Sequence, residues 1–100
     1  SGAAIHIHNN GKFLYTSDRG NNSLNLFYIE SNTGLLKYIN SFNCGGDSPR
    51  DFSIDPSGKY IVCANEKSNN LSIFSINQSN GDLTLLNSIT TPSPTCIVFA

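Results

Sequence analysis

The sequence predicts an all-β fold, and two observations lead to that prediction. No segment shows helical periodicity over more than one turn, whereas short apolar segments alternate with polar turns rich in Gly and Asn, residues that tight turns favour. Shifting the chain along itself by about 47 residues also aligns its first half with its second, a spacing typical of repeat architectures. The chain therefore consists of a repeated, strand-rich unit.

The repeat is specific because the matching positions include both turn residues and apolar residues. The matching pairs are Ile7 with Ile54, Gly11 with Gly58, Asn22 with Asn69, Leu24 with Leu71, Phe27 with Phe74, Ile29 with Ile76 and Gly34 with Gly81. With a two-residue deletion near Cys44, Ser48-Pro49 then match Ser93-Pro94. A third copy therefore begins at Thr95.

Each unit is expected to contain four short strands joined by tight turns. In the first unit the strands are expected near residues 3–8, 12–17, 23–30 and 35–42, and in the second near 51–55, 59–64, 70–76 and 83–89. A ninth strand is expected near residues 95–99, in the incomplete third copy. The segments SNTG and QSNGD have the composition of hairpin turns between the third and fourth strands.

Apolar residues in the second and third strands point to both faces of each sheet. Phe13, Leu14 and Tyr15 are consecutive, whereas a sheet with one face in water alternates apolar and polar residues. Both faces must be covered, as in the stacked blades of a β-propeller. We therefore expect an all-β propeller fragment of about two four-stranded antiparallel blades plus one closing strand. It forms one partial domain over 1–100, with blade repeats at 3–47 and 50–92 and a final strand at 95–100.

Two blades do not close a ring, since propellers usually contain about four to eight blades. Uncovered blade faces would leave large apolar patches in water. We therefore expect the remaining blades of a longer parent chain to cover them, with self-association as the alternative.

Composition argues against several classes of function. The net charge of −1 provides no basic surface for nucleic acid or an anionic membrane. No apolar run approaches the roughly 20 residues that span a bilayer, so we expect no membrane partner and a cytoplasmic location. The cysteines Cys44, Cys63 and Cys96 are odd in number and lack CxxC spacing, which favours reduced thiols over a zinc site. No cofactor is expected.

Four segments resemble a known family: GKFLYTSDRG, SPRDFSIDPSGKY, NLSIF and PSPTCIVF. Together they resemble the seven-bladed lactonase propellers, the 6-phosphogluconolactonase-like proteins also labelled 3-carboxymuconate cyclase, from Gly2 to Phe99. The resemblance implies a cytoplasmic hydrolase that opens the lactone of a phosphorylated sugar acid. We expect the isolated chain to be inactive, because all blades line a propeller's mouth. A non-catalytic binding propeller and a carboxymuconate-type cycloisomerase are the alternatives.

The charged residues of both repeats are expected on one rim of the propeller. In a four-strand meander, the turn after the second strand and the connection into the next blade lie at the same end. This rim carries Asp18-Arg19, Ser48-Pro49-Arg50 and Glu66-Lys67. The first strand of a blade is the innermost, so Arg50 is expected near the central axis.

Arg50, Arg19 and Asp18 are the candidate substrate-binding residues. A guanidinium group holds a phosphate or carboxylate through two parallel hydrogen bonds, which the Lys ammonium does not reproduce. The structural alternative for Arg50 is an ion pair with Asp18, Asp47 or Asp51 that fixes adjacent blades. Asp18 replaces the Asn of the family's N-R-G pattern, which places a carboxylate next to Arg19.

Glu66 and Asp51 are the candidate catalytic residues. A carboxylate at Glu66 can position or deprotonate the water that opens a lactone, and an arginine can stabilise the developing oxyanion. The structural alternative for Glu66 is a solvated turn residue. Asp51 either orients the adjacent Arg50 or is a polar residue that begins the strand.

His6 and His8 lie two residues apart on one face of the first strand. Such a pair can bind a metal, but the sequence offers no third ligand, so no metal site is expected. His8 matches Asp55 of the second repeat, where a side chain can cap the following turn. We expect the histidines to act as a turn cap or as packed strand residues.

Overall fold

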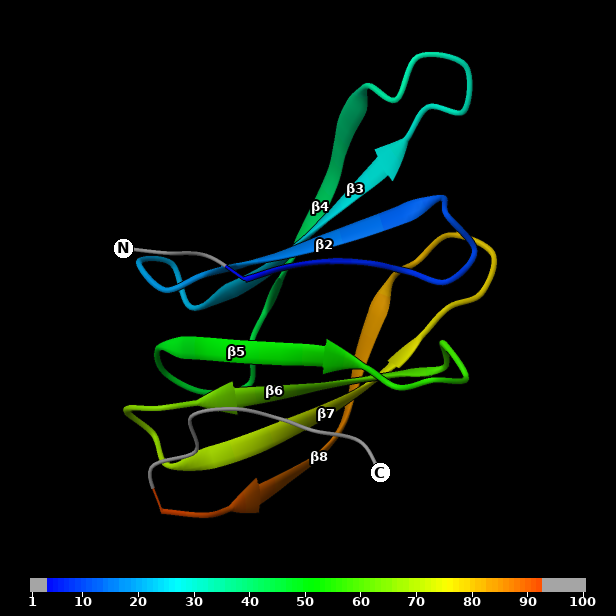
Figure 1. Ribbon diagram of the computed structural model, residues 1–100. Helices are drawn as coiled ribbons and strands as arrows, with labels where there is room; N and C mark the ends of the chain where they lie inside the picture. Colours follow the sequence, from blue (N-terminus) through cyan, green and yellow to red (C-terminus); the bar gives the residue numbers. More distant parts are fainter. Residues whose placement is uncertain (1–3, 93–100) are drawn as a thin grey trace.

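The structure, a computed structural model, describes residues 4–92, and these residues form strands and turns without a helix. The strands are β1 (Ile5–Ile7), β2 (Phe13–Asp18), β3 (Ser23–Ile29), β4 (Leu36–Asn43), β5 (Pro49–Ile54), β6 (Tyr60–Asn65), β7 (Asn70–Ile76) and β8 (Leu83–Thr90) (Figure 1). The eight strands expected in this part of the chain are confirmed to within two residues at each end. The ninth, near residues 95–99, lies outside the described residues.

The strands form two antiparallel sheets of four strands, with the orders β1-β2-β3-β4 and β5-β6-β7-β8. The predicted fold class, a propeller fragment with two four-stranded blades, is therefore confirmed. The repeat extends to the backbone: the register shifts between Leu26 and Phe27 in one blade and between Ile73 and Phe74 in the other. Asn22 and Asn69 also share a left-handed conformation, with φ of 51° and 52°, which Asn tolerates better than most residues.

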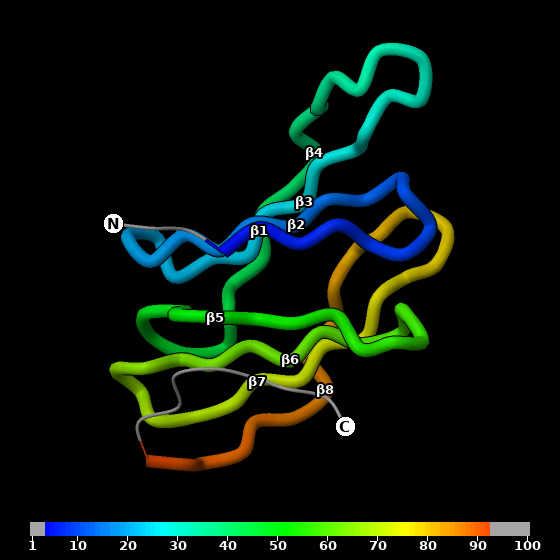
Figure 2. The backbone as a smooth tube through the Cα atoms, in the orientation of Figure 1, coloured from blue at the N-terminus to red at the C-terminus, as the bar shows by residue number. Residues whose placement is uncertain are grey.

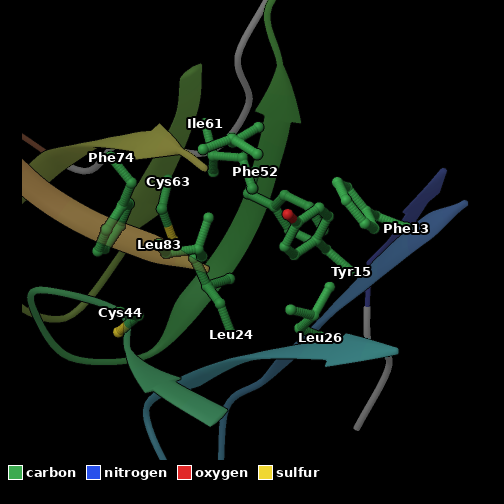
Figure 3. Packing of buried hydrophobic residues seen from close by; sticks show 11 residues of the cluster. Phe13, Tyr15, Leu24, Leu26, Cys44, Phe52, Ile61, Cys63, Phe74 and Leu83 are labelled. Atoms are coloured by element: carbon green, nitrogen blue, oxygen red, sulfur yellow. The ribbon is translucent and has the colours of Figure 1, made fainter. Parts of the chain in front are cut away.

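The core lies between the two blades. The first blade contributes Phe13, Tyr15, Leu24 and Leu26, and the second contributes Phe52, Ile61, Cys63, Phe74, Ile76 and Leu83, with Cys44 from the connection between them (Figure 3). Burying one Phe or Leu side chain contributes about 1.5–3 kcal/mol, so this face-to-face packing is the main source of stability in the described part of the chain. Cys44 and Cys63 are free thiols, as the sequence predicted for them.

Hydrogen bonds also join the blades at the rim that carries the β1–β2 turn. The Tyr15 hydroxyl donates to the carbonyl of Gly81 over 2.5 Å. His8 Nε2 donates to the carbonyl of Gly58 over 2.7 Å, and His8 Nδ1 accepts from the amide of Asn10 over 3.0 Å. His8 is therefore the buried turn cap that the sequence predicted. His6 packs edge-on against the ring of Phe52 with 4.7 Å between ring centres.

Each blade has two faces, and the second blade packs one of its faces against the first blade. The equivalent face of the first blade, which carries the matching residues of the repeat, lies on the outside of the described structure. Ile5 is 61% exposed, whereas Phe52, its counterpart in the repeat, is fully buried. Phe27 is half-buried on this outer face, and its counterpart Phe74 is only 2% exposed. The first blade therefore exposes, on its outer face, positions that the second blade buries against the first.

Candidate ligand-binding rim

The predicted charged rim exists, and it brings together three side chains from separate segments. Arg50 Nη1 donates to Glu66 Oε2 over 2.9 Å, and Arg19 Nη2 lies 3.5 Å from Glu66 Oε1. Glu66 thus bridges an arginine from each blade. Figures 1 and 2 show the β2–β3 turn, the β4–β5 connection and the β6–β7 turn together at the left of the molecule.

Two hydrogen bonds link these three segments to one another. The Glu66 amide donates to the Ser48 carbonyl over 2.9 Å, and the Ser48 amide donates to Asn22 Oδ1 over 2.8 Å. Ser48 itself has a φ of 60°, an uncommon conformation for Ser that these contacts hold in place. The Asn22–Ser48 contact was missed from the sequence, although the recurrence of Asn at this turn and at Asn69 was an available signal.

A pocket of about 320 Å³ opens at this rim. Its lining residues are Arg19, Gly20, Asp47, Ser48, Glu66 and Lys67. The pocket therefore combines two cationic side chains with two carboxylates at the junction of the blades. Such a pocket can hold a polar ligand and a water molecule next to an acid–base group.

Asp18 is occupied by its own turn. Its carboxylate accepts hydrogen bonds from the side chain of Asn21 over 2.8 Å and from the amides of Gly20 and Asn21 over 3.0 and 3.3 Å. The side-chain hydrogen bond from Asn21 is the main reason that the pKa of Asp18 is lowered, and the backbone amides add to it. Asp18 therefore caps its own turn through Gly20 and Asn21.

The remaining predicted residues differ in their placement. Arg50 is paired with Glu66, a partner that the sequence did not suggest for it, and half of its side chain is exposed. Neither Arg50 nor Asp51 is among the residues that line the rim pocket. The Oδ1 atom of Asp51 lies 3.9 Å from His6 Nε2 across the blade boundary, whereas Arg50 reaches the pocket through its pair with Glu66. Glu66 is thus the candidate catalytic carboxylate that the structure brings to both arginines.

A larger pocket of about 490 Å³ lies on the outer face of the first blade. It is lined by Asp18, Asn21, Ser23, Asn25, Phe27, Tyr38 and Ser41. Phe27 has its repeat counterpart in Phe74, which the first blade buries in the interface between blades. Because the equivalent position of the second blade is buried between the blades, the rim pocket is the better candidate for a ligand site.

The described residues give no support to two other kinds of site. Within residues 4–92, no group of three or more His, Cys, Asp or Glu side chains is arranged to hold a metal ion. The same residues contain no helix of the length and apolarity that crossing a membrane requires.

Two stacked four-stranded blades with a charged rim define a β-propeller protein. The sequence model of the family described as "Lactonase, 7-bladed beta-propeller" matches residues 1–99. The chain belongs to this family of seven-bladed lactonase propellers. The resemblance stated from the sequence motifs is therefore confirmed.

Individual relatives agree with this assignment. The chain is 36% identical over 56 residues to the 6-phosphogluconolactonase of Bacillus subtilis and 49% identical over 57 residues to that of Formosa agariphila. These matches cover 56% and 55% of this chain, but only 16% of each relative. The periplasmic gluconolactonase PpgL of Pseudomonas aeruginosa superposes with a TM-score of 0.89 at 30% identity, over 95% of this chain and 27% of that one.

Proposed function

We propose that this chain supplies two blades of a hydrolase that opens the lactone ring of a phosphorylated sugar acid. In this reaction water adds to the lactone carbonyl carbon, the bond from that carbon to the ring oxygen breaks, and the ring oxygen leaves as a hydroxyl group after gaining a proton. Glu66 would position the water and accept its proton. Arg50 would stabilise the oxyanion that forms on the carbonyl oxygen.

The observation that carries the proposal is the Arg50–Glu66–Arg19 bridge beside the rim pocket. The bridge places Glu66, the candidate base, between Arg19 and Arg50, the candidate anion-binding groups. All three lie on the rim that carries the β2–β3 and β6–β7 turns. The names of the Bacillus subtilis and Formosa agariphila relatives support 6-phosphogluconolactone as the substrate to test.

We further propose that the site works only in a complete propeller, in which the remaining blades of a longer chain cover the exposed faces. Ile5 and Ile7 on the first blade are 61% and 60% exposed, and Tyr60 on the second is 42% exposed. These apolar side chains occupy positions that stacked blades bury. Sedimentation of the isolated chain tests the alternative, self-association through the same faces.

A chimeric propeller tests the proposed activity. Residues 4–92 would replace the structurally matching blades of Pseudomonas aeruginosa PpgL, and the release of acid from 6-phosphogluconolactone would be followed with a pH indicator. We expect turnover by the chimera and none by the isolated chain. Turnover by a monomer of the isolated chain would contradict the need for the other blades, and an inactive but folded chimera would contradict the proposed reaction.

Arg50→Lys in the chimera tests the role of the rim. Because Arg50 would stabilise an oxyanion that forms only in the transition state, replacing its guanidinium should cost about 1–3 kcal/mol of transition-state stabilisation, seen as a lower kcat with little change in KM or Tm. Lys12→Arg, on the opposite rim, is the matched control. A lower Tm with an unchanged kcat would identify Arg50 as a structural residue that joins the blades.

A cytoplasmic location is also proposed. The buried free thiols of Cys44 and Cys63 support it, because reducing compartments maintain free thiols. PpgL of Pseudomonas aeruginosa is described as periplasmic, so cell fractionation of the native protein is the appropriate test.

A further inference from the structure

The two arginines that contact Glu66 are held very differently. Arg50 Nη1 makes a 2.9 Å hydrogen bond to Glu66 Oε2, whereas Arg19 Nη2 is 3.5 Å from Oε1, at the limit of a hydrogen bond. Arg19 Nε is in addition buried, and no residue in the described part of the chain accepts its hydrogen. A buried N–H without an acceptor is destabilising, so this atom marks a place where an acceptor is missing.

The surroundings of Arg19 suit an incoming anion. Arg19 lines the rim pocket together with Lys67, which supplies a second cation. Two carboxylates also line it, Glu66 and Asp47, while the Asp18 carboxylate beside Arg19 is engaged by its own turn. An anion with several acceptor oxygens can accept hydrogen bonds from Nε and Nη2 of one guanidinium at once.

We infer that Arg19 and Lys67 hold the phosphate group of the ligand, and that this group displaces Glu66 from Arg19 but leaves the Glu66–Arg50 pair intact. Glu66 Oε1 is then released to bind the water that attacks the lactone. In the free protein, Glu66 occupies the position of the ligand's anion at Arg19. This inference deepens the proposed function and rests on it for the identity of the reacting group.

Inorganic phosphate and the intact chain are sufficient to test the pocket. The chain contains two arginines, so its ¹⁵N–¹H spectrum has two Nε–H resonances, and Arg19→Lys identifies the one that belongs to Arg19. At constant ionic strength, phosphate should shift the Arg19 resonance to saturation and slow the exchange of its proton with water. A linear shift without saturation, or no shift, would overturn the inference.

Variants distinguish a displaceable carboxylate from a structural one. Glu66→Gln should bind phosphate roughly three- to tenfold more tightly than the wild type, because it removes the competing charge from Arg19. Lys67→Gln should bind roughly tenfold more weakly, whereas Lys12→Gln on the opposite rim should bind as the wild type does. If Glu66→Gln does not fold, Glu66→Asp replaces it, since the shorter side chain cannot bridge both arginines. Equal or weaker binding by the folded Glu66 variant would refute displacement.

The phosphate-binding test and the chimera activity test can fail independently of each other. Saturable phosphate binding at Arg19 with an inactive chimera would retain the pocket and refute lactone hydrolysis. If the chimera is active but the isolated chain shows no phosphate binding at Arg19, the proposed hydrolysis stands and the phosphate pocket is refuted.

Discussion

Replacing Gly58 by Ala tests how strongly the turn rim joins the two blades. Gly58 has a φ of +74°, and an added Cβ would lie 2.8 Å from both His8 Nε2 and Asn9 Oδ1 and 2.9 Å from His8 Cε1. Gly11 occupies the equivalent turn of the first blade with a φ of +72°, but a Cβ there meets nothing within 4 Å. Gly11→Ala is therefore a matched control that adds backbone strain alone.

The expected magnitude follows from these contacts. The left-handed conformation costs Ala about 1–2 kcal/mol at either position. At Gly58 the Cβ also drives the buried imidazole away from the Gly58 carbonyl, which removes a hydrogen bond worth about 0.5–1.5 kcal/mol and forces a packing shift of about 1–3 kcal/mol. Gly58→Ala should therefore lower the free energy of unfolding by about 1.5–4.5 kcal/mol more than Gly11→Ala.

Urea unfolding followed by circular dichroism measures this difference. In a His8→Ala background most of the extra loss at Gly58 should disappear, because the imidazole is gone and only Asn9 Oδ1, at the end of an exposed side chain, still lies within 3 Å of the new Cβ. If Gly58→Ala and Gly11→Ala lower the free energy of unfolding equally in the wild-type background, the reasoning is refuted, because the His8 side chain would then have moved without loss of stability.

Two further predictions concern buried and capping side chains. Tyr15→Phe should lower the free energy of unfolding by about 1–3 kcal/mol in urea, because the Gly81 carbonyl loses its donor, while the exposed Tyr38→Phe should change it little. Burial raises the pKa of Tyr15 above 10, so above that pH the folded state keeps a proton that the unfolded state loses. The free energy of unfolding should therefore fall above about pH 10, by up to roughly 1.4 kcal/mol per pH unit. The fall should be less steep in Tyr15→Phe. Burial opposes ionisation of Asp55, yet hydrogen bonds, the 2.6 Å one from the Ser57 hydroxyl foremost, hold its pKa below the ordinary value. The Asp55 contribution is present above about pH 4 and is lost as pH falls through the lowered pKa, so acid titration of Asp55→Asn should lack this loss; an unchanged acid transition would contradict the capping role.

The sequence by itself determined the strands, the turns and the rim on which the charges lie. Strand and turn preferences are local, and the second copy of each pattern repeats the first: Gly11 and Gly58 mark equivalent turns, and Phe27 and Phe74 mark equivalent strands. The assignment of Arg19, Arg50 and Glu66 to one rim also followed, because strand order in a meander fixes the end at which each turn emerges.

Only the tertiary structure decided which of these charges meet. The contact between Arg50 and Glu66 joins residues 16 positions apart, and whether Arg19 reaches the same carboxylate depends on the distance and angle between two blades. That geometry is set by how the apolar side chains of the core interlock, a property of both faces together that no local pattern encodes. For the same reason the sequence grouped Asp51 with Glu66 as a candidate catalytic carboxylate, whereas the packing of the blades turns Asp51 towards His6 and leaves Glu66 between the arginines.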